Sequence, residues 1–242
     1  MRPIDSKLPN VGTTIFTLMS QLAQQHGAVN LSQGFPDFSP PEPLLELVDR
    51  ACRGRFHQYA LMPGAMPLRT AIAHKLAALY GVEADPVAEI TVTSGATEAI
   101  FDAIQAVVRS GDEVIVFDPC YDSYEPSIAL AGGRTVHVPL SLPGFGIDWE
   151  RLGEALNRRT RLVIVNSPHN PSGALVGKED WQRLAELLRP FDCYLLSDEV
   201  YEHVVFDGVG HATALANAEL RQRCFAVFSF GTILEQRWGG RR

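Results

Sequence analysis

Short apolar runs alternate with amphipathic segments along most of the chain, from residue 89 onward. The apolar runs predict strands at residues 90–93, 113–117, 134–138, 161–165, 193–197 and 224–228. Apolar positions at helical spacing predict helices between them, at residues 96–109, 123–131, 148–156 and 178–189. Such alternation is typical of β-α-β units with right-handed crossovers. We therefore expect an α/β fold with a mostly parallel, doubly wound sheet and helices on both of its faces.

The chain before residue 89 has a different pattern, with helices and turns but no regular alternation. Residues 1–12 are rich in turn formers and predict an extended arm. Helical spacing of apolar residues predicts helices at residues 15–23 and 41–52. A third helix follows from the stripe Leu68, Ile72, Leu76 and Leu79, and it is expected to end at Gly81.

Composition restricts the classes of partner. The chain has 242 residues, of which 46% are hydrophobic, enough for a sizeable core. It contains neither an apolar run of the roughly 18 residues that a membrane helix needs nor a signal-peptide pattern, so we expect a cytoplasmic protein. The net charge of -7, without a basic cluster in the main body, argues against nucleic acid and membrane as partners.

The cysteines and histidines do not predict a metal centre. Four cysteines (Cys52, Cys120, Cys193 and Cys224) are widely spaced and form no Cys-x-x-Cys pair, which indicates neither a zinc site nor a disulfide framework. We interpret them as small buried hydrophobic residues. The seven histidines lack the usual zinc spacings, and His169 is expected to be a loop residue.

The candidate chemistry lies in the loops that follow the predicted strands. These loops read SGAT (94–97), DPCY (118–121), NSPHNPSG (166–173), DEVY (198–201) and SFG (229–231). In a doubly wound sheet such loops share one edge, where ligands bind. Asp198 ends a predicted buried strand, so it is either a ligand contact or a helix-cap or turn residue. Small residues at 94–97 suit a phosphate at a helix N-terminus, whereas capping by Ser94 or Thr97 is the structural alternative.

Common nucleotide and hydrolase signatures do not fit. The run GALVGKE at residues 173–179 is one residue too short for a P-loop and lacks the following Ser or Thr. Gly144 and Gly146 lack the third glycine of a dinucleotide-binding loop, and no Gly-x-Ser-x-Gly motif is present.

Taken in order, the loops resemble those of fold-type I pyridoxal-phosphate enzymes, specifically the class I/II aminotransferases. The resemblance runs from about Leu8 to Gly231. Three motifs look closest to the branch of kynurenine, glutamine and methionine aminotransferases: LSQGFPDF (31–38), HQY (57–59) and NPSG (170–173). The resemblance implies transfer of an amino group between an amino acid and a 2-oxo acid, with pyridoxal 5′-phosphate as cofactor.

The resemblance also implies a cofactor site. It would consist of Gly95, Ala96, Thr97, Tyr121, Asn170, Asp198, Tyr201 and Ser229. Residues 95–97 and Ser229 would hold the phosphate, and Tyr121 would stack on the pyridine ring. Asn170 and Tyr201 would hydrogen-bond the phenolic oxygen, and Asp198 would keep the ring nitrogen protonated, because an opposite charge favours the ionised form.

The same resemblance implies a homodimer. Gly34 matches the substrate and phosphate surroundings, and Tyr59 would be donated to them by a second subunit. We expect three segments along the chain. Residues 1–40 form an N-terminal arm and helix with a substrate-side loop, residues 41–231 an incomplete cofactor-binding large domain, and residues 232–242 a divergent tail.

One position departs from the family. The lysine that holds the cofactor covalently and moves the reacting proton is expected directly after Gly231, and this chain has Thr232 there. Lys178 is too distant in sequence to replace it and is expected to start a surface helix. Residues 233–242 also lose the pattern, which predicts a truncated chain without the small C-terminal domain. We therefore expect negligible turnover and, because a strand position would be unfilled, low stability.

Two alternatives remain open beside the aminotransferase hypothesis. The first is a non-catalytic pyridoxal-phosphate-binding remnant, a pseudoenzyme that could dimerise with an intact paralogue. The second is a different doubly wound ligand-binding domain, which the ordered match of five loops disfavours.

Overall fold

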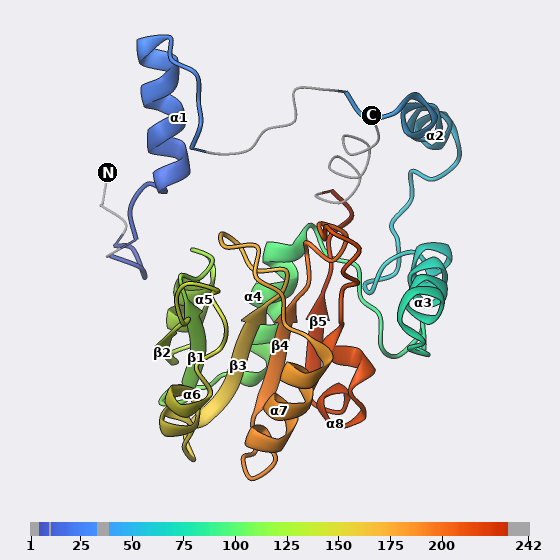
Figure 1. The fold of residues 1–242 in the computed structure, drawn as a ribbon. Helices are drawn as coiled ribbons and strands as arrows, with labels where there is room; N and C mark the ends of the chain where they lie inside the picture. The colour runs from blue at the N-terminus through green and yellow to red at the C-terminus, as the bar shows by residue number, and fades with distance from the viewer. Residues whose placement is uncertain (1–4, 10, 33–38, 232–242) are drawn as a thin grey trace.

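A five-stranded parallel sheet forms the centre of the protein (Figure 1). The structure is a computed structural model that describes residues 5–9, 11–32 and 39–231. The strands are β1 (Glu113–Asp118), β2 (Arg134–Pro139), β3 (Thr160–Asn166), β4 (Tyr194–Asp198) and β5 (Cys224–Val227). Their spatial order is β2-β1-β3-β4-β5, and every neighbouring pair is parallel.

Helices cover both faces of the sheet, which confirms the predicted doubly wound fold. One face is covered by α4 (Ala96–Val107) and α5 (Tyr124–Leu130). The other is covered by α6 (Trp149–Ala155), α7 (Lys178–Leu188), the short 3₁₀ helix η1 (Ala214–Ala216) and α8 (Ala218–Arg221). Lys178 is the first residue of α7 and is exposed, as expected.

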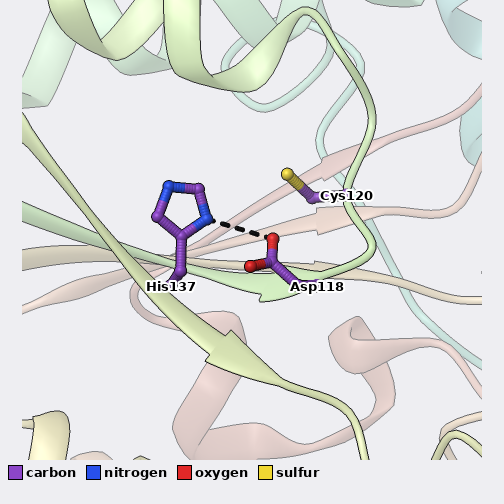
Figure 2. Close-up of side chains that lie close together, drawn as sticks. All are labelled: Asp118, Cys120 and His137. Carbon is purple, nitrogen blue, oxygen red and sulfur yellow. Dashed lines mark hydrogen bonds and ion pairs between the residues drawn. The ribbon is translucent and has the colours of Figure 1, made fainter.

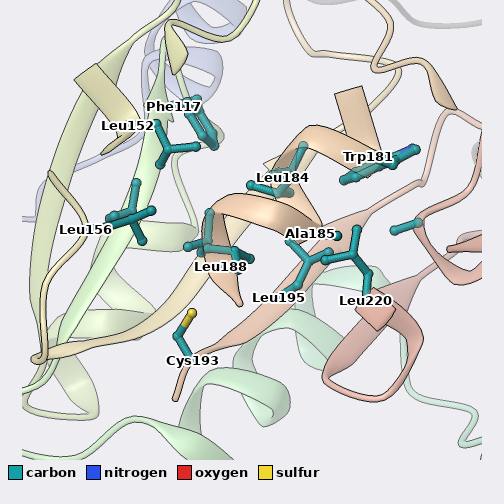
Figure 3. Packing of buried hydrophobic residues seen from close by; sticks show 14 of the residues in the cluster. Phe117, Leu152, Leu156, Trp181, Leu184, Ala185, Leu188, Cys193, Leu195 and Leu220 are labelled. Carbon is teal, nitrogen blue, oxygen red and sulfur yellow. The ribbon is translucent and has the colours of Figure 1, made fainter. Parts of the chain in front are cut away.

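The interior strands are apolar on both faces because helices exclude water from each side. On the α7 face, Leu195 of β4 packs with Trp181, Leu184 and Leu188 of α7, and all four side chains are buried (Figure 3). On the other face, Val114 and Val116 of β1 pack in one cluster with residues of α4 and α5. Each fully buried Leu or Val side chain contributes about 1.5–3 kcal/mol, so these two clusters hold the sheet and helices together.

The N-terminal helices lie outside this core. They are α1 (Ile15–His26), α2 (Glu42–Arg53) and α3 (Met66–Tyr80), and α1 and α2 stand clear of the sheet (Figure 1). Local signals define α1: the Thr14 hydroxyl caps its first turn, and Gly27 ends it with a φ of 58°. No residue of α1 or α2 is buried, so their apolar faces have no partner among the described residues of the chain.

Helix α3 is tied to the loop after β4 by buried polar contacts. Lys75 forms an ion pair with Glu202, and the Tyr80 hydroxyl donates a hydrogen bond to the same carboxylate. The Glu202 side chain is 0% exposed, so its charge depends on Lys75, on Tyr80 and on His203, whose Nε2 lies 3.7 Å from Oε1. The predicted apolar stripe of α3 is only partly right, because Leu76 is buried whereas Leu68 and Leu79 are 39% and 50% exposed.

Two further predictions are wrong. Residues 90–93 form no strand; the Val92 amide instead donates to the Pro63 carbonyl at 2.9 Å. A strand needs a neighbour, and in the described part of the chain no strand pairs with this segment. Of the four cysteines expected to be buried, Cys193 is buried, Cys120 and Cys224 are partly buried, and Cys52 is exposed on α2.

Among the described helices, none combines the length and apolar character needed to cross a membrane.

Candidate functional site

The candidate site lies at the carboxyl edge, which we define as the loops after β1, β3 and β4 together with the N-terminus of α4. Asp198, the last residue of β4, occupies this edge and is 3% exposed. Its Oδ2 accepts a 2.5 Å hydrogen bond from the Tyr124 hydroxyl, and its Oδ1 accepts a 3.4 Å bond from the Val200 amide. The carboxylate is therefore held in place by α5 and by its own loop. No α-helix starts directly after it, which removes the helix-cap interpretation. The bond from the Val200 amide, two residues on, is the turn contact that the sequence also allowed.

The electrostatic state of Asp198 is unusual. Burial raises the pKa of its carboxyl from 3.8 to about 6, although the hydrogen bonds from Tyr124 and Val200 act in the opposite direction. The same environment raises the pKa of Tyr124 well above 10, first through burial and then through the Asp198 charge. A buried carboxylate whose charge is penalised in this way is suited to a cationic ligand.

A chain of hydrogen bonds extends from the Asp198 backbone to the loop after β3. Asn166 Nδ2 donates to the Asp198 carbonyl at 2.9 Å, and Asn166 Oδ1 accepts from the Asn170 amide at 2.7 Å. Asn170 Nδ2 in turn lies 3.5 Å from the Tyr201 hydroxyl. Burial raises the pKa of Tyr201. Asn170, Asp198 and Tyr201, which the sequence placed in one site, are therefore linked by this chain.

The N-terminus of α4 presents the features expected of an anion site. Gly95 is the N-cap, with a φ of 102°, and no side chain caps the helix, so the capping by Ser94 or Thr97 considered above is absent. A Cβ at Gly95 would meet nothing within 4 Å, and Gly95 and Thr97 are exposed while Ala96 is partly buried. Glu98 accepts a hydrogen bond from the Ser94 amide, which places one carboxylate beside this N-terminus.

Tyr121 lies in the loop after β1 and contacts Tyr124, the residue that holds Asp198. Its ring packs edge-on against that of Tyr124, with centroids 5.8 Å apart and an interplanar angle of 78°. Tyr121, Tyr124 and Asn166 line one cavity, together with His169.

His169 is a loop residue, as expected, but it is buried: its two ring nitrogens contact the Pro119 carbonyl and the Ser172 hydroxyl. Burial lowers its pKa, which favours the neutral ring.

Three other predicted site residues and Thr232 remain. Ser229 is partly buried just beyond β5. Tyr59 is fully exposed between α2 and α3, at 104% relative exposure, and so lies open for contact with another molecule. Gly34 and Thr232 lie outside the described residues.

Sequence reasoning missed two residues of the site, Tyr124 and Asn166. Tyr124 follows Tyr121 by three residues across a turn, in which the Tyr124 amide donates to the Tyr121 carbonyl, and that short spacing is a usable signal once Tyr121 is singled out. Asn166 ends β3 directly beside Asp198 in the register of β3 and β4, which only the sheet order reveals.

The residues fit pyridoxal 5′-phosphate on structural grounds. The edge combines an uncapped helix N-terminus, which favours a phosphate, with a buried carboxylate that lacks a cationic partner among the described side chains. An aromatic ring and two hydrogen-bonding side chains accompany them. The doubly wound sheet and the residues at its carboxyl edge together match the large domain of a pyridoxal-phosphate transferase.

Comparison with known proteins shows which family of pyridoxal-phosphate enzymes the chain belongs to. The family model for aminotransferase class I and II matches residues 26–234, and the chain therefore belongs to that family. Members of this family use pyridoxal 5′-phosphate.

Relatives of known structure share the fold at substantial identity. A methionine aminotransferase from Escherichia coli is 52% identical over 226 residues, which are 93% of this chain and 58% of that protein. A crystal structure of an Escherichia coli methionine aminotransferase superposes with a TM-score of 0.92 at 49% identity, covering 98% of this chain and 62% of that one. The N-succinyldiaminopimelate aminotransferase of Mycobacterium tuberculosis gives a TM-score of 0.89 at 41% identity, covering 94% and 60%. The chain thus spans about three fifths of these relatives.

Proposed function

We propose that this protein binds pyridoxal 5′-phosphate at the carboxyl edge and is part of an aminotransferase that exchanges an amino group between an amino acid and a 2-oxo acid. The observation that carries the proposal is Asp198, a buried carboxylate with a raised pKa at the end of β4. A protonated pyridine nitrogen would supply the positive charge that this environment lacks.

Each site residue has a proposed task toward the cofactor. The amides of residues 95–97 would bind the phosphate, where the helix dipole favours an anion, and Ser229 would add a hydroxyl. Asp198, oriented by Tyr124, would hold the proton on the ring nitrogen. Tyr121 would cover one face of the ring and exclude water from it. Asn170 and Tyr201 would hydrogen-bond the phenolic oxygen. The bound cofactor supplies an electron sink for the reacting substrate.

Substrate contacts are proposed for two further residues. Gly34 and Tyr59 would approach the substrate and phosphate, Tyr59 from a second subunit. The name of the Escherichia coli relative makes methionine the first amino donor to test.

A homodimer accords with the exposed N-terminal segment. Large apolar side chains, including Leu18, Leu22, Phe56, Tyr59 and Met62, are between 38% and 104% exposed. Patches of this kind mark interaction surfaces. Sedimentation velocity with the wild type and with Phe56→Ser/Met62→Ser tests this: we expect a dimer that the double substitution weakens, and a wild-type monomer would contradict it. The three-segment division of the chain and the cytoplasmic location stay predictions.

A second candidate function follows from Thr232. Threonine has no amine to hold the cofactor covalently, which favours a non-catalytic cofactor-binding protein that pairs with an intact paralogue. Under this alternative the carboxyl edge still binds pyridoxal phosphate, and only the transfer of the amino group is lost.

Cofactor titration separates these possibilities. We expect pyridoxal phosphate to raise the melting temperature of the wild type, and Asp198→Ala to abolish that rise. Borohydride should leave no cofactor bound to a lysine in the wild type, whereas Thr232→Lys should acquire a borohydride-stable bond at residue 232. Transamination of methionine by Thr232→Lys would support the aminotransferase, whereas cofactor binding by that variant without turnover would support the non-catalytic alternative. An equal response of the wild type and Asp198→Ala would overturn the proposed site.

A further inference from the structure

Asp118, Cys120 and His137 come together beside the carboxyl edge although 19 residues separate Asp118 from His137 (Figure 2). Asp118 ends β1, Cys120 follows in the next loop, and His137 lies on the neighbouring strand β2. His137 is in register with Val116, two residues before Asp118. Because side chains alternate along a strand, His137 and Asp118 project from the same face of the sheet.

The three side chains present one ligand atom each toward a common space. His137 Nδ1 lies 3.0 Å from Asp118 Oδ1, and the imidazole nitrogen, carboxylate oxygen and sulfur all lie within 4.8 Å of one another. Figure 2 shows the sulfur of Cys120 directed back toward the His137–Asp118 pair. In a tetrahedral zinc site with ordinary bond lengths, ligand atoms are roughly 3.4–3.6 Å apart. Relative to that spacing, the 3.0 Å Nδ1–Oδ1 pair would open by about 0.5 Å, and the longest separation, at most 4.8 Å, would close by up to about 1.4 Å.

Exposure leaves room for this adjustment and for entry of an ion. The side chains of His137 and Asp118 are 42% and 38% exposed, and Cys120 is partly buried. Rotation of the exposed imidazole costs little because no core contact is lost. An exposed contact contributes only about 0–1 kcal/mol even where both groups are charged, so the His137–Asp118 hydrogen bond adds little to stability.

We propose that Asp118, Cys120 and His137 form a binding site for a single zinc ion, with the fourth coordination position open to water. Thiolate, imidazole and carboxylate together are the ligand types that zinc accepts, whereas magnesium and calcium prefer oxygen alone. Three protein ligands and one water complete a tetrahedron. None of the three ligands is a proposed cofactor residue, although Cys120 directly precedes Tyr121 and lines the same cavity.

Binding is balanced by the release of a proton. Zinc binds the sulfur of Cys120 as the thiolate, so the proton of the free thiol has to leave. The ion replaces this proton as the Zn–S bond forms, and no oxidation or reduction is involved.

Cobalt(II) is the probe, since it takes the place of zinc and its thiolate complexes absorb in the near ultraviolet. The protein is freed of metal with a chelator and titrated without pyridoxal phosphate, which itself binds metals. We expect one equivalent of cobalt to give a thiolate band that zinc abolishes by displacement. Cys120→Ser should remove the band, and His137→Gln and Asp118→Asn should each weaken binding at least about tenfold, since even outer-shell partners are worth roughly 10–100-fold.

Matched controls are available in the same chain. Cys52→Ser removes an exposed thiol on α2, and Asp122→Asn removes an exposed carboxylate from the same loop as Cys120. Both should bind cobalt as the wild type does. Absence of the thiolate band in the wild type, its persistence in Cys120→Ser, or unchanged affinity in His137→Gln would each overturn the proposal. Circular dichroism confirms that each variant is folded.

Discussion

The Tyr124 hydroxyl donates a 2.5 Å hydrogen bond to Oδ2 of Asp198, joining α5 to the end of β4 across 74 residues of sequence. Both side chains are buried, so water cannot replace either partner. A hydrogen bond to a buried charge is worth about 1.5–3 kcal/mol, compared with about 0.5–1.5 for a neutral pair.

Removing this hydroxyl should therefore have a pH-dependent cost. In Tyr124→Phe without cofactor, we expect the free energy of unfolding to fall by about 1.5–3 kcal/mol at pH 8, where Asp198 is ionised. The loss should shrink to about 0.5–1.5 kcal/mol at pH 5, where the carboxyl is protonated in the folded state. Urea unfolding at the two pH values measures this. Tyr194→Phe, on an exposed side chain of β4, is the control and should show no such difference.

Asp198 itself should make the cofactor-free protein less stable as pH rises. Its pKa is raised from 3.8 to about 6 in the folded state, so the folded form retains the proton longer than the unfolded form. This contribution is complete below about pH 4 and disappears as pH increases to about 6, with a total of about 3 kcal/mol. Comparing the wild type with Asp198→Asn by urea unfolding isolates it. A constant difference between the two proteins from pH 4 to 7 would contradict the raised pKa.

At Gly95 there is space for the methyl group of an alanine, but the backbone conformation disfavours any residue other than glycine. Its φ of 102° is one that L-residues rarely adopt, although a Cβ would meet no atom within 4 Å. We expect Gly95→Ala to cost about 1–3 kcal/mol in stability and to weaken pyridoxal-phosphate binding about tenfold, since strain relief would tilt the amides of the α4 N-terminus. Thermal unfolding and cofactor titration by absorbance measure the two effects.

The matched control is Gly153→Ala, in the exposed part of α6, where nothing lies within 4 Å of an added Cβ. This substitution should stabilise the protein by about 0.5–1 kcal/mol, because alanine favours a helix interior. Opposite signs for the two glycines would confirm that the backbone conformation, and not available space, decides the result at Gly95.

The contact between α3 and the loop after β4 should depend on Lys75. Without its ammonium group, the fully buried Glu202 carboxylate keeps the Tyr80 hydrogen bond but loses its close cation. We expect Lys75→Met to lower the free energy of unfolding by about 3–5 kcal/mol. Lys178→Met, at the exposed start of α7, removes the same charge and should change it by less than about 0.5 kcal/mol. Equal effects of the two substitutions would show that Glu202 does not need Lys75.

Most secondary structure beyond residue 95 was predictable from local patterns. The apolar runs of β1, β3 and β4 are buried on both sides, and α4, α5, α6 and α7 lie within about two residues of their predicted ends. The short helices η1 and α8 were not predicted. The order of the loops was sufficient for the family resemblance, because ligand-binding residues follow the strands in sequence. Asp198 at the end of β4 was identified as the central residue on this basis.

The sequence by itself could not decide which distant residues meet. Residues 90–93 have a strand-like sequence but no neighbouring strand, and the apolar sides of α1 and α2 have no partner in the described chain. Periodicity reports only which side of an element is apolar, not what covers it. The strand order decides that Asn166 lies beside Asp198, and the β1–β2 register decides that His137 reaches Asp118. The burial that gives Asp198 its raised pKa likewise arises only when β4 is enclosed by the helices on both faces.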